Sequence, residues 1–219
     1  MNINIILADD HHVIREGLRL LLDREKDLLV IAEADTGRSA LSAVKKFNPD
    51  LVVMDVSMPE LNGVEATRKI LSEVPATKVL ALSMYSDRRF VEGMFQAGVS
   101  GYILKNCIAR ELVSAIRLVA KGQVYISPEI AGSIVDGYLS RVVPQTDTNR
   151  RIDRKILTDR EREILQLICE GQNSKEVAET LHVSSKTVDA HRRNIMEKVG
   201  VHSIAELTKF AIREGITTL

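Results

Sequence analysis

The sequence predicts an α/β protein: a doubly wound, five-stranded parallel sheet, followed by a second, smaller all-α domain with a helix-turn-helix. Residues 1–122 alternate short apolar runs, rich in Ile, Val and Leu, with amphipathic segments. Beyond a polar stretch at 144–149, every segment has helical periodicity. Short buried strands that alternate with helices form parallel sheets covered by helices on both faces, so residues 1–122 are predicted to have a doubly wound α/β fold.

The expected elements follow in order along the chain. Strands are predicted at residues 3–8, 28–33, 51–54, 78–82 and 101–104. Helices are predicted between and after them at 12–23, 38–46, 64–72, 87–97 and 109–120. Turn-forming pairs separate these segments at Thr36-Gly37, Asn48-Pro49, Asn62-Gly63 and Ala97-Gly98.

The pattern changes after residue 122. Ser127 and Pro128 are typical of a helix start, and that helix is expected to reach about residue 140. The polar residues 144–149 predict a flexible linker. Four further helices are predicted at 159–170, 174–181, 185–199 and 203–214. The predicted division is therefore a first domain at 1–122, a partly helical linker at 123–154 and a small domain at 155–219.

Composition restricts the class of protein. The 219 residues are enough for one large domain or two modest ones, and a content of 45% hydrophobic and 27% charged residues suits globular cores. The net charge is zero, but residues 150–219 carry 13 Lys and Arg against 11 Asp and Glu, and the remainder carries 17 against 19. No apolar run approaches the roughly 20 residues that span a bilayer, so no membrane partner is expected. Cys107 and Cys169 form no metal or disulfide pattern, and Asp9 comes too early for a signal peptide, so we expect a cytoplasmic protein.

Acidic residues follow two of the predicted strands. Asp9 and Asp10 come after the first strand, and Asp55 comes after the third. Carboxyl ends of parallel strands meet at one edge of a sheet, where these hard oxygen ligands would suit Mg²⁺. Asp55 could then attack a phosphorus atom and form an acyl phosphate.

Ser83 and Lys105 also follow predicted strands. Lys105 could pair with one phosphoryl oxygen, and Ser83 could donate a hydrogen bond to another. Each residue has an ordinary alternative, because an Asp after a strand often caps the next helix and a Lys there is often only solvated. Their order along the chain, each at a strand end, favours a common site.

These residues resemble the receiver domain of bacterial two-component response regulators. The matching residues are Asp9-Asp10-His11, Met54-Asp55-Val56-Ser57-Met58-Pro59, Gly63, Ser83 and Gly101-Tyr102-Ile103-Leu104-Lys105. The resemblance implies a flavodoxin-like fold in which Asp55 takes a phosphoryl group from the phosphohistidine of a sensor histidine kinase. It implies Mg²⁺ on Asp10, Asp55 and the Ser57 backbone carbonyl, with Asp9 supporting these ligands from behind.

The resemblance also implies that Ser83 and Tyr102 form the family's switch pair, in which a hydroxyl turns toward the phosphate and the ring follows. One departure is Asn106, where many receivers have proline, so a trans peptide is expected after Lys105. Tyr85, two residues beyond Ser83, is hypothesised to slow loss of the phosphoryl group.

The segment from residue 158 predicts a helix-turn-helix. Thr158 and Glu161 have the spacing of a capping box, and a tight turn at 182–184 separates two helices. The second helix has two faces. Its expected core side carries Val188, Ile195 and Val199, with His191 at the edge, and its expected groove side carries Lys186, Asp189, Ala190, Arg193 and Glu197. Periodicity alone leaves an ordinary amphipathic helix open, and the spacing of the two helices favours DNA binding.

This segment resembles the LuxR-type DNA-binding domain. The matching residues are Leu157-Thr158, Arg160-Glu161, Gly171, Lys175-Glu176-Val177-Ala178, Leu181, Val183-Ser184, Thr187-Val188, His191 and Lys198-Val199-Gly200-Val201. The family's base-reading positions fall on Asp189, Ala190 and Arg193, and His191 is expected to be structural. Residues expected to contact phosphates are Lys175, Lys186, Thr187, Arg192 and Lys198.

Together the two resemblances imply a NarL/FixJ-type response regulator and not an enzyme. Its expected partners are a sensor histidine kinase, double-stranded DNA and, on activation, a second copy of itself. The last helix, with Ile204, Leu207, Phe210 and Ala211 at helical spacing, is either a dimer surface or part of the small domain's core. Two alternatives are an aspartate-nucleophile phosphatase of small molecules and a transcription factor that ignores phosphorylation.

Overall fold

The computed structural model describes residues 2–106, 109–132 and 156–217, and it divides the chain into two units, Met1–Pro144 and Gln145–Leu219. The strands of the first unit are β1 (Ile3–Ala8), β2 (Leu28–Ala34), β3 (Leu51–Asp55), β4 (Lys78–Ser83), β5 (Gly101–Leu104) and β6 (Tyr125–Ile126). Its helices are α1 (His12–Leu22), α2 (Gly37–Phe47), α3 (Gly63–Glu73), α4 (Arg88–Ala97) and α5 (Ala109–Ala120).

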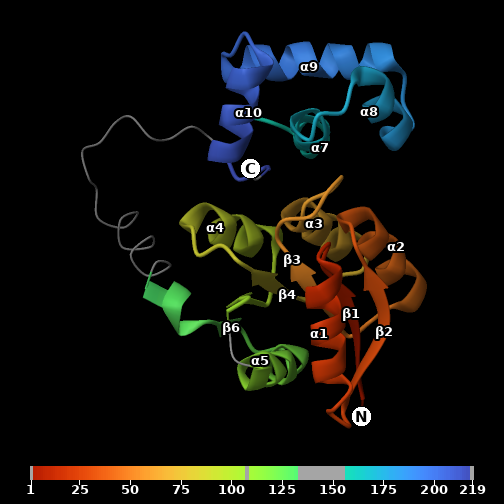
Figure 1. Cartoon of the computed structure of the whole chain (residues 1–219), viewed down its shortest axis with the longest axis vertical. Coiled ribbons are helices and arrows are strands. Elements are labelled where there is room, and N and C mark those ends of the chain that lie inside the picture. The colour runs from red at the N-terminus through yellow and green to blue at the C-terminus, as the bar shows by residue number, and fades with distance from the viewer. Residues whose placement is uncertain (1, 107–108, 133–155, 218–219) are drawn as a thin grey trace. The chain divides into compact units, whose positions relative to one another are not determined.

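All six strands are parallel, in the order β2-β1-β3-β4-β5-β6. Figure 1 shows α1 and α5 on one side of the sheet and α2, α3 and α4 on the other. Successive strand residues therefore enter different cores. Ile5 and Leu7 pack with α1 and α5, whereas Ile6 and Ala8 pack with α2, α3 and α4. The predicted doubly wound fold is confirmed.

The sixth strand was not predicted. It is only two residues long, so it carries no periodic pattern in the sequence. It pairs with β5 through Gly101–Tyr125 and Tyr102–Ile126, and the amide of Ser127 donates to the Tyr102 carbonyl over 3.0 Å. The sheet thus continues four residues past the predicted domain end at 122. A helix begins at residues 128–132, as Ser127 and Pro128 predicted, and the expected remainder to 140, with the linker at 144–149, lies outside the described residues.

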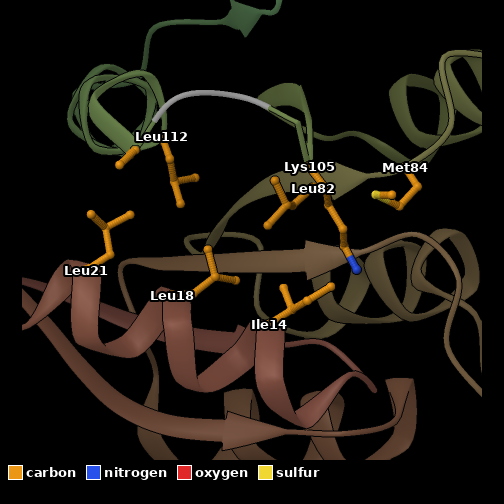
Figure 2. A pocket seen from close by; sticks show the side chains of 8 residues that line it. Ile14, Leu18, Leu21, Leu82, Met84, Lys105 and Leu112 are labelled. Atoms are coloured by element: carbon orange, nitrogen blue, oxygen red, sulfur yellow. The ribbon is translucent and has the colours of Figure 1, made fainter.

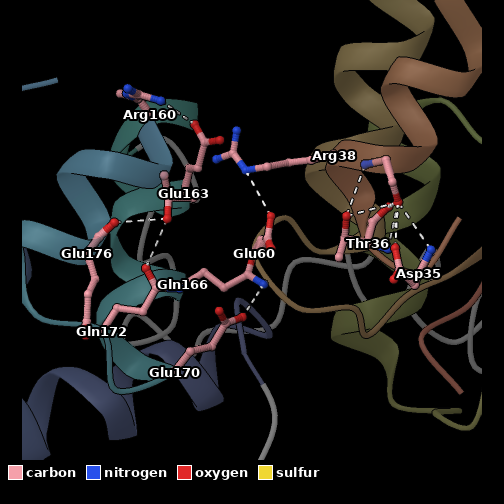
Figure 3. Close-up of polar contacts among 12 residues, drawn as sticks. Asp35, Thr36, Arg38, Glu60, Arg160, Glu163, Gln166, Glu170, Gln172 and Glu176 are labelled. Atoms are coloured by element: carbon pink, nitrogen blue, oxygen red, sulfur yellow. Dashed lines mark hydrogen bonds and ion pairs between the residues drawn. The ribbon is translucent and has the colours of Figure 1, made fainter. Parts of the chain in front are cut away.

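The second unit contains α7 (Asp159–Cys169), α8 (Ser174–Leu181), α9 (Ser185–Val199) and α10 (Ile204–Arg213). The capping box predicted at Thr158 and Glu161 is present, and His182 ends α8 in a left-handed conformation with φ of 53°. Arg160 of α7 connects to the end of α8. One of its nitrogens lies 2.9 Å from buried Glu163 (Figure 3), and another donates to the Leu181 carbonyl over 3.0 Å.

The last helix contributes to the core of this unit. Leu207, Phe210 and Ala211 are buried against α7 and its neighbours, and among the four residues proposed for a dimer surface only Ile204 is exposed. The dimer-surface hypothesis is therefore wrong for those three residues, because their apolar area is already used within the domain. None of the helices in the described residues is long and apolar enough to cross a membrane.

Candidate functional site

The predicted acidic site lies where the strand order reverses. β1 and β3 are neighbours, and their connections leave in opposite directions, so a crevice forms beyond their carboxyl ends. Asp9 directly follows β1, Asp55 is the last residue of β3, and Lys105 directly follows β5. The Lys105 ammonium lies 2.8 Å from Asp9 Oδ2 and 2.6 Å from Asp55 Oδ2. The structure thus brings together three residues that are 46 and 50 positions apart in the sequence.

The cluster holds more negative than positive charge. Asp9, Asp55 and Lys105 are all buried, with side-chain exposures of 4% or less, and Asp10 beside them is exposed. Burial raises the pKa of Asp55 to about 6, although Lys105 acts against this. Burial would by itself lower the pKa of Lys105, but its contacts with Asp55 and Asp9 outweigh burial and raise that pKa. The pocket therefore keeps a charged lysine beside a carboxylate that gains from any further cation.

The residues present fit a divalent cation. Ligand atoms of Asp9, Asp10, His11 and Asp55 all lie within 4.8 Å of one another. Asp9 Oδ2 is buried and lies 2.8 Å from the Lys105 ammonium, which occupies only part of the accepting capacity of this carboxylate. Three carboxylates beside a single ammonium are a set of donors typical of Mg²⁺ sites. The Ser57 amide donates to Asp55 Oδ1 over 3.3 Å, so Ser57, whose carbonyl is the predicted metal ligand, lies beside Asp55.

The hydroxyl groups of Ser83 and Tyr102 are both hydrogen-bonded to the backbone of Tyr85. The Tyr85 amide donates to the Ser83 hydroxyl over 3.0 Å, and the Tyr102 hydroxyl donates to the Tyr85 carbonyl over 2.7 Å. Both switch-pair side chains are fully buried, and burial raises the pKa of Tyr102 to about 12. The Tyr85 ring stacks on Phe90, with centroids 4.7 Å apart. Sequence reasoning missed this link because backbone groups carry no residue-type signal, and the effect of Tyr85 on phosphoryl lifetime stays a prediction.

Two further residues fix the geometry of the pocket. A Cβ on Gly63 would lie 2.0 Å from the Asp55 carbonyl oxygen, so only glycine lets α3 begin this close to β3. Arg15 donates to the Asp9 carbonyl and to Glu33, whose side chain it meets at 3.0 Å. Arg15 was not predicted, because nothing in its spacing points to the loop that it holds. The peptide bond after Lys105 is trans, as predicted from Asn106, which stands where many receivers have proline.

An apolar cavity of about 360 Å³ adjoins the acidic pocket (Figure 2). Its lining residues come from α1, the ends of β4 and β5, and α5: Ile14, Leu18, Leu21, Leu82, Met84, Lys105, Ala109 and Leu112. Among these described residues, Lys105 is the only charged one. Its aliphatic stem therefore borders apolar surface, while its ammonium contacts the carboxylates of Asp9 and Asp55.

The residues predicted to meet DNA lie on α8 and α9. Val188 and Ile195 are fully buried, which confirms the core side of α9, and Val199 is partly exposed. The predicted contact residues are exposed, apart from partly exposed Ala190: Lys175, Lys186, Thr187, Asp189, Arg192, Arg193 and Lys198. Asp189 accepts a hydrogen bond from Ser174 over 2.6 Å, which ties α9 to the first turn of α8.

Lys198 stands apart from the other predicted phosphate contacts. Its ammonium lies 2.7 and 2.8 Å from the two carboxylate oxygens of Glu161, which also caps α7. The side chain thus has a structural partner within its own domain. Its contact with DNA stays a prediction.

Two family models match the chain: the response regulator receiver domain over residues 5–117, and the luxR family of bacterial regulatory proteins over residues 155–211. The chain is a NarL/FixJ-type response regulator. It is 41% identical over 214 residues to the oxygen regulatory protein NreC of Staphylococcus aureus, covering 97% of this chain and 98% of the relative. It is 36% identical over 222 residues to the transcriptional regulatory protein DegU of Brevibacillus brevis, covering 97% and 94%.

A solved structure agrees with the family. The crystal structure of a LuxR-family two-component response regulator from Aurantimonas sp. SI85-9A1 shares 37% identity with this response regulator, with a TM-score of 0.61. It aligns with 64% of this chain and with 99% of its own. The relatives are regulators, so this response regulator is not an enzyme of the small-molecule phosphatase class.

Proposed function

We propose that Asp55 takes a phosphoryl group from the phosphohistidine of a sensor histidine kinase, and that the phosphorylated form dimerises and binds double-stranded DNA through α9. The observation that carries the proposal is the buried contact of Lys105 with both Asp9 and Asp55 at the carboxyl ends of the strands. We place this activity in the cytoplasm, where DNA and the kinase's phosphoryl donor domain would both be accessible.

The transfer needs few protein groups. An Asp55 carboxylate oxygen attacks phosphorus, a P–O bond forms as the P–N bond breaks, and the departing imidazole nitrogen keeps the electron pair. Lys105 pairs with a phosphoryl oxygen in the product, giving up its contact with the former Asp55 carboxylate. Mg²⁺ held by Asp10, Asp55 and the Ser57 carbonyl, with Asp9 behind them, would neutralise charge on the transferred group.

The switch would pass through the Tyr85 backbone. When the Ser83 hydroxyl turns to the phosphoryl group, it gives up the hydrogen bond from the Tyr85 amide. Tyr102 donates to the carbonyl of the same residue, so a shift of this backbone changes the surroundings of both switch residues. The proposed division of the chain is a receiver at 1–122, a connecting segment at 123–154, whose first residues extend the receiver's sheet, and a DNA-binding domain at 155–219.

A DNA-binding selection tests the whole proposal. The full chain is treated with beryllofluoride, a phosphoryl mimic, in parallel with Asp55→Ala. We expect enrichment of a two-fold symmetric site by the treated wild type and not by the variant, and a shift from monomer to dimer in light scattering. Equal enrichment with and without beryllofluoride would instead favour a transcription factor that ignores phosphorylation.

Base reading is tested at one residue. Arg193 is exposed on α9 and can bridge guanine O6 and N7, and Asp189 can accept from a cytosine amino group. Arg193→Ala should relax preference at one base pair of each half-site, at a cost of about 1–3 kcal/mol per half-site. Uniform weakening on all sequences would move Arg193 to the class of phosphate contacts.

A further inference from the structure

The acidic pocket contains an imidazole that the phosphoryl chemistry does not use. His11 Nδ1 lies 2.9 Å from Asp10 Oδ1 and 3.4 Å from Asp9 Oδ1. It belongs to the same group of ligand atoms, all within 4.8 Å of one another, as the three carboxylates. The imidazole is therefore already beside the carboxylate oxygens that would surround a cation.

Helix capping does not explain this histidine. His11 occupies the N-cap position of α1, where Ser, Thr, Asp and Asn are preferred, and its side chain makes no capping hydrogen bond. Its amide instead donates to Asp9 Oδ1 over 2.9 Å, so the Asp9 side chain fixes the backbone that carries the ring. The Nδ1 atom therefore lies beside Asp9 and Asp10, while the side chain as a whole is 60% exposed.

A mixed set of nitrogen and oxygen ligands has a different metal preference from carboxylates alone. Mg²⁺ prefers oxygen ligands and gains little from imidazole, whereas later divalent ions such as Co²⁺, Ni²⁺ and Zn²⁺ bind imidazole well. A neutral imidazole has one nitrogen with a free lone pair, and exchange of its tautomers gives Nδ1 that lone pair. Asp9 Oδ2 already lies 2.8 Å from the Lys105 ammonium, so the oxygen ligands for such an ion would come from Asp10, Asp55 and the remaining lone pairs of Asp9.

We propose that His11 is a metal ligand that raises the affinity of the phosphorylation pocket for late divalent transition ions without raising its affinity for Mg²⁺. The inference rests on the metal site of the proposed function and adds a nitrogen ligand to it. Mg²⁺ would be held by oxygen atoms alone, and a Co²⁺-class ion by the same carboxylates together with the His11 ring.

The test uses Co²⁺ as the probe and the full chain. Titration calorimetry compares Co²⁺ and Mg²⁺ binding to wild type, His11→Ala and His12→Ala. His12 is the matched control, because it is the next residue, it is also exposed, and its Nδ1 lies 3.7 Å from Glu16 and outside the pocket. Proton NMR of the Co²⁺ form reports the ligand directly, since the ring N–H of a coordinated histidine moves far outside the normal spectrum.

We expect His11→Ala to weaken Co²⁺ binding by about tenfold or more, while its Mg²⁺ affinity stays within about twofold of wild type. The shifted ring N–H resonance should be present in wild type and His12→Ala and absent in His11→Ala. Equal losses for both ions, or no shifted resonance at a Co²⁺ site that does bind, would overturn the role of His11 and leave the magnesium site standing. Absence of Mg²⁺ binding in the wild type would instead overturn the metal part of the proposed function, and this inference with it.

Discussion

Each unit of the chain contains a lysine that meets two carboxylate oxygens, and the two arrangements differ in charge balance and burial. Lys105 is 4% exposed and lies between Asp9 and Asp55, so one ammonium faces two buried carboxylates. Lys198 is 41% exposed and meets both oxygens of the single carboxylate of Glu161. The first cluster has an excess of negative charge, and the second is balanced.

The difference separates the proposed phosphorylation site from an ion pair that holds the helical domain together. In the receiver, burial raises the pKa of Asp55, so its charged form is costly in the folded protein. In the helical domain, the pKa of Glu161 is lowered, because hydrogen bonds from Lys198 and Thr158 together outweigh the effect of burial. Removing a carboxylate should therefore have opposite effects on stability in the two units.

The largest effect is expected where the backbone positions Asp55. Gly63→Ala places a Cβ 2.0 Å from the Asp55 carbonyl oxygen, and neither backbone can move without disturbing the pocket. We expect a loss of about 3 kcal/mol or more in unfolding free energy. All four tyrosines of the chain lie before residue 144 and there is no tryptophan, so tyrosine fluorescence in urea follows the receiver alone.

Gly17→Ala is the control for this substitution. Gly17 lies inside α1, and a Cβ there meets nothing within 4 Å. Alanine should stabilise the helix by about 0.5–1 kcal/mol. A loss of less than about 1 kcal/mol in Gly63→Ala would show that Asp55 is not held by this backbone contact.

Asp55→Asn should stabilise the receiver at neutral pH in the absence of divalent cations. The pKa of Asp55 rises from 3.8 to about 6 on folding, which corresponds to roughly 3 kcal/mol as an upper figure. The folded protein binds the Asp55 proton more tightly than the unfolded chain does. The unfolding free energy of the wild type should therefore fall as pH rises from about 4 to 6. Asp55→Asn has no carboxyl to ionise there, so its unfolding free energy should not show this fall. Urea unfolding at pH 4.5 and 7, followed by tyrosine fluorescence, measures both.

Millimolar Mg²⁺ provides the control for that prediction. A bound cation stabilises the charged carboxylate, so Mg²⁺ should raise the stability of the wild type and have little effect on Asp55→Asn. A variant less stable than the wild type at pH 7 without Mg²⁺ would make the Lys105 cluster a structural ion pair like that of Lys198, and the comparison would fail.

Glu161→Gln should destabilise the helical domain, in contrast to Asp55→Asn. The amide keeps an oxygen for the Thr158 amide but loses the ion pair with Lys198, for a cost of about 1 kcal/mol. Because the pKa of Glu161 is lowered on folding, its contribution is present above the unfolded pKa and is lost as pH falls through the folded one. Amide hydrogen exchange in α7 of the full chain, at pH 7, should show faster opening in the variant, and unchanged exchange would contradict the assigned role.

The sequence predicted the side chains that act through their chemistry better than the contacts that position them. Asp9, Asp55 and Lys105 could be found because each follows an apolar run, and parallel strands bring such positions to one edge. The Tyr85 backbone could not be found, because an amide and a carbonyl exist at nearly every residue. The pair of Glu161 and Lys198 was missed for a related reason: long side chains 37 residues apart meet only after α7 and α9 have packed.

The same reasoning explains the errors in the outer parts of the fold. The two residues of β6 are held by β5, and their own pattern is too short to predict a strand. Leu207, Phe210 and Ala211 have the spacing of an apolar face, and spacing alone does not distinguish a face that packs within the domain from one that meets a second copy.

The smallest effect is expected for Lys198 in DNA binding, and it distinguishes the structural ion pair from the predicted phosphate contact. Each phosphate contact made by a lysine contributes about 0.9 to the slope of log affinity against log salt on duplex DNA. Lys186→Gln, at the exposed start of α9, removes one contact from each subunit of the proposed dimer, so it should lower that slope by about two and weaken binding on all sequences alike. Lys198→Gln should leave the slope unchanged, because its ammonium already neutralises Glu161. A decrease of about two for Lys198→Gln as well would mean that DNA draws this lysine away from Glu161 in both subunits, and the balanced cluster would then be a site that changes partners on binding.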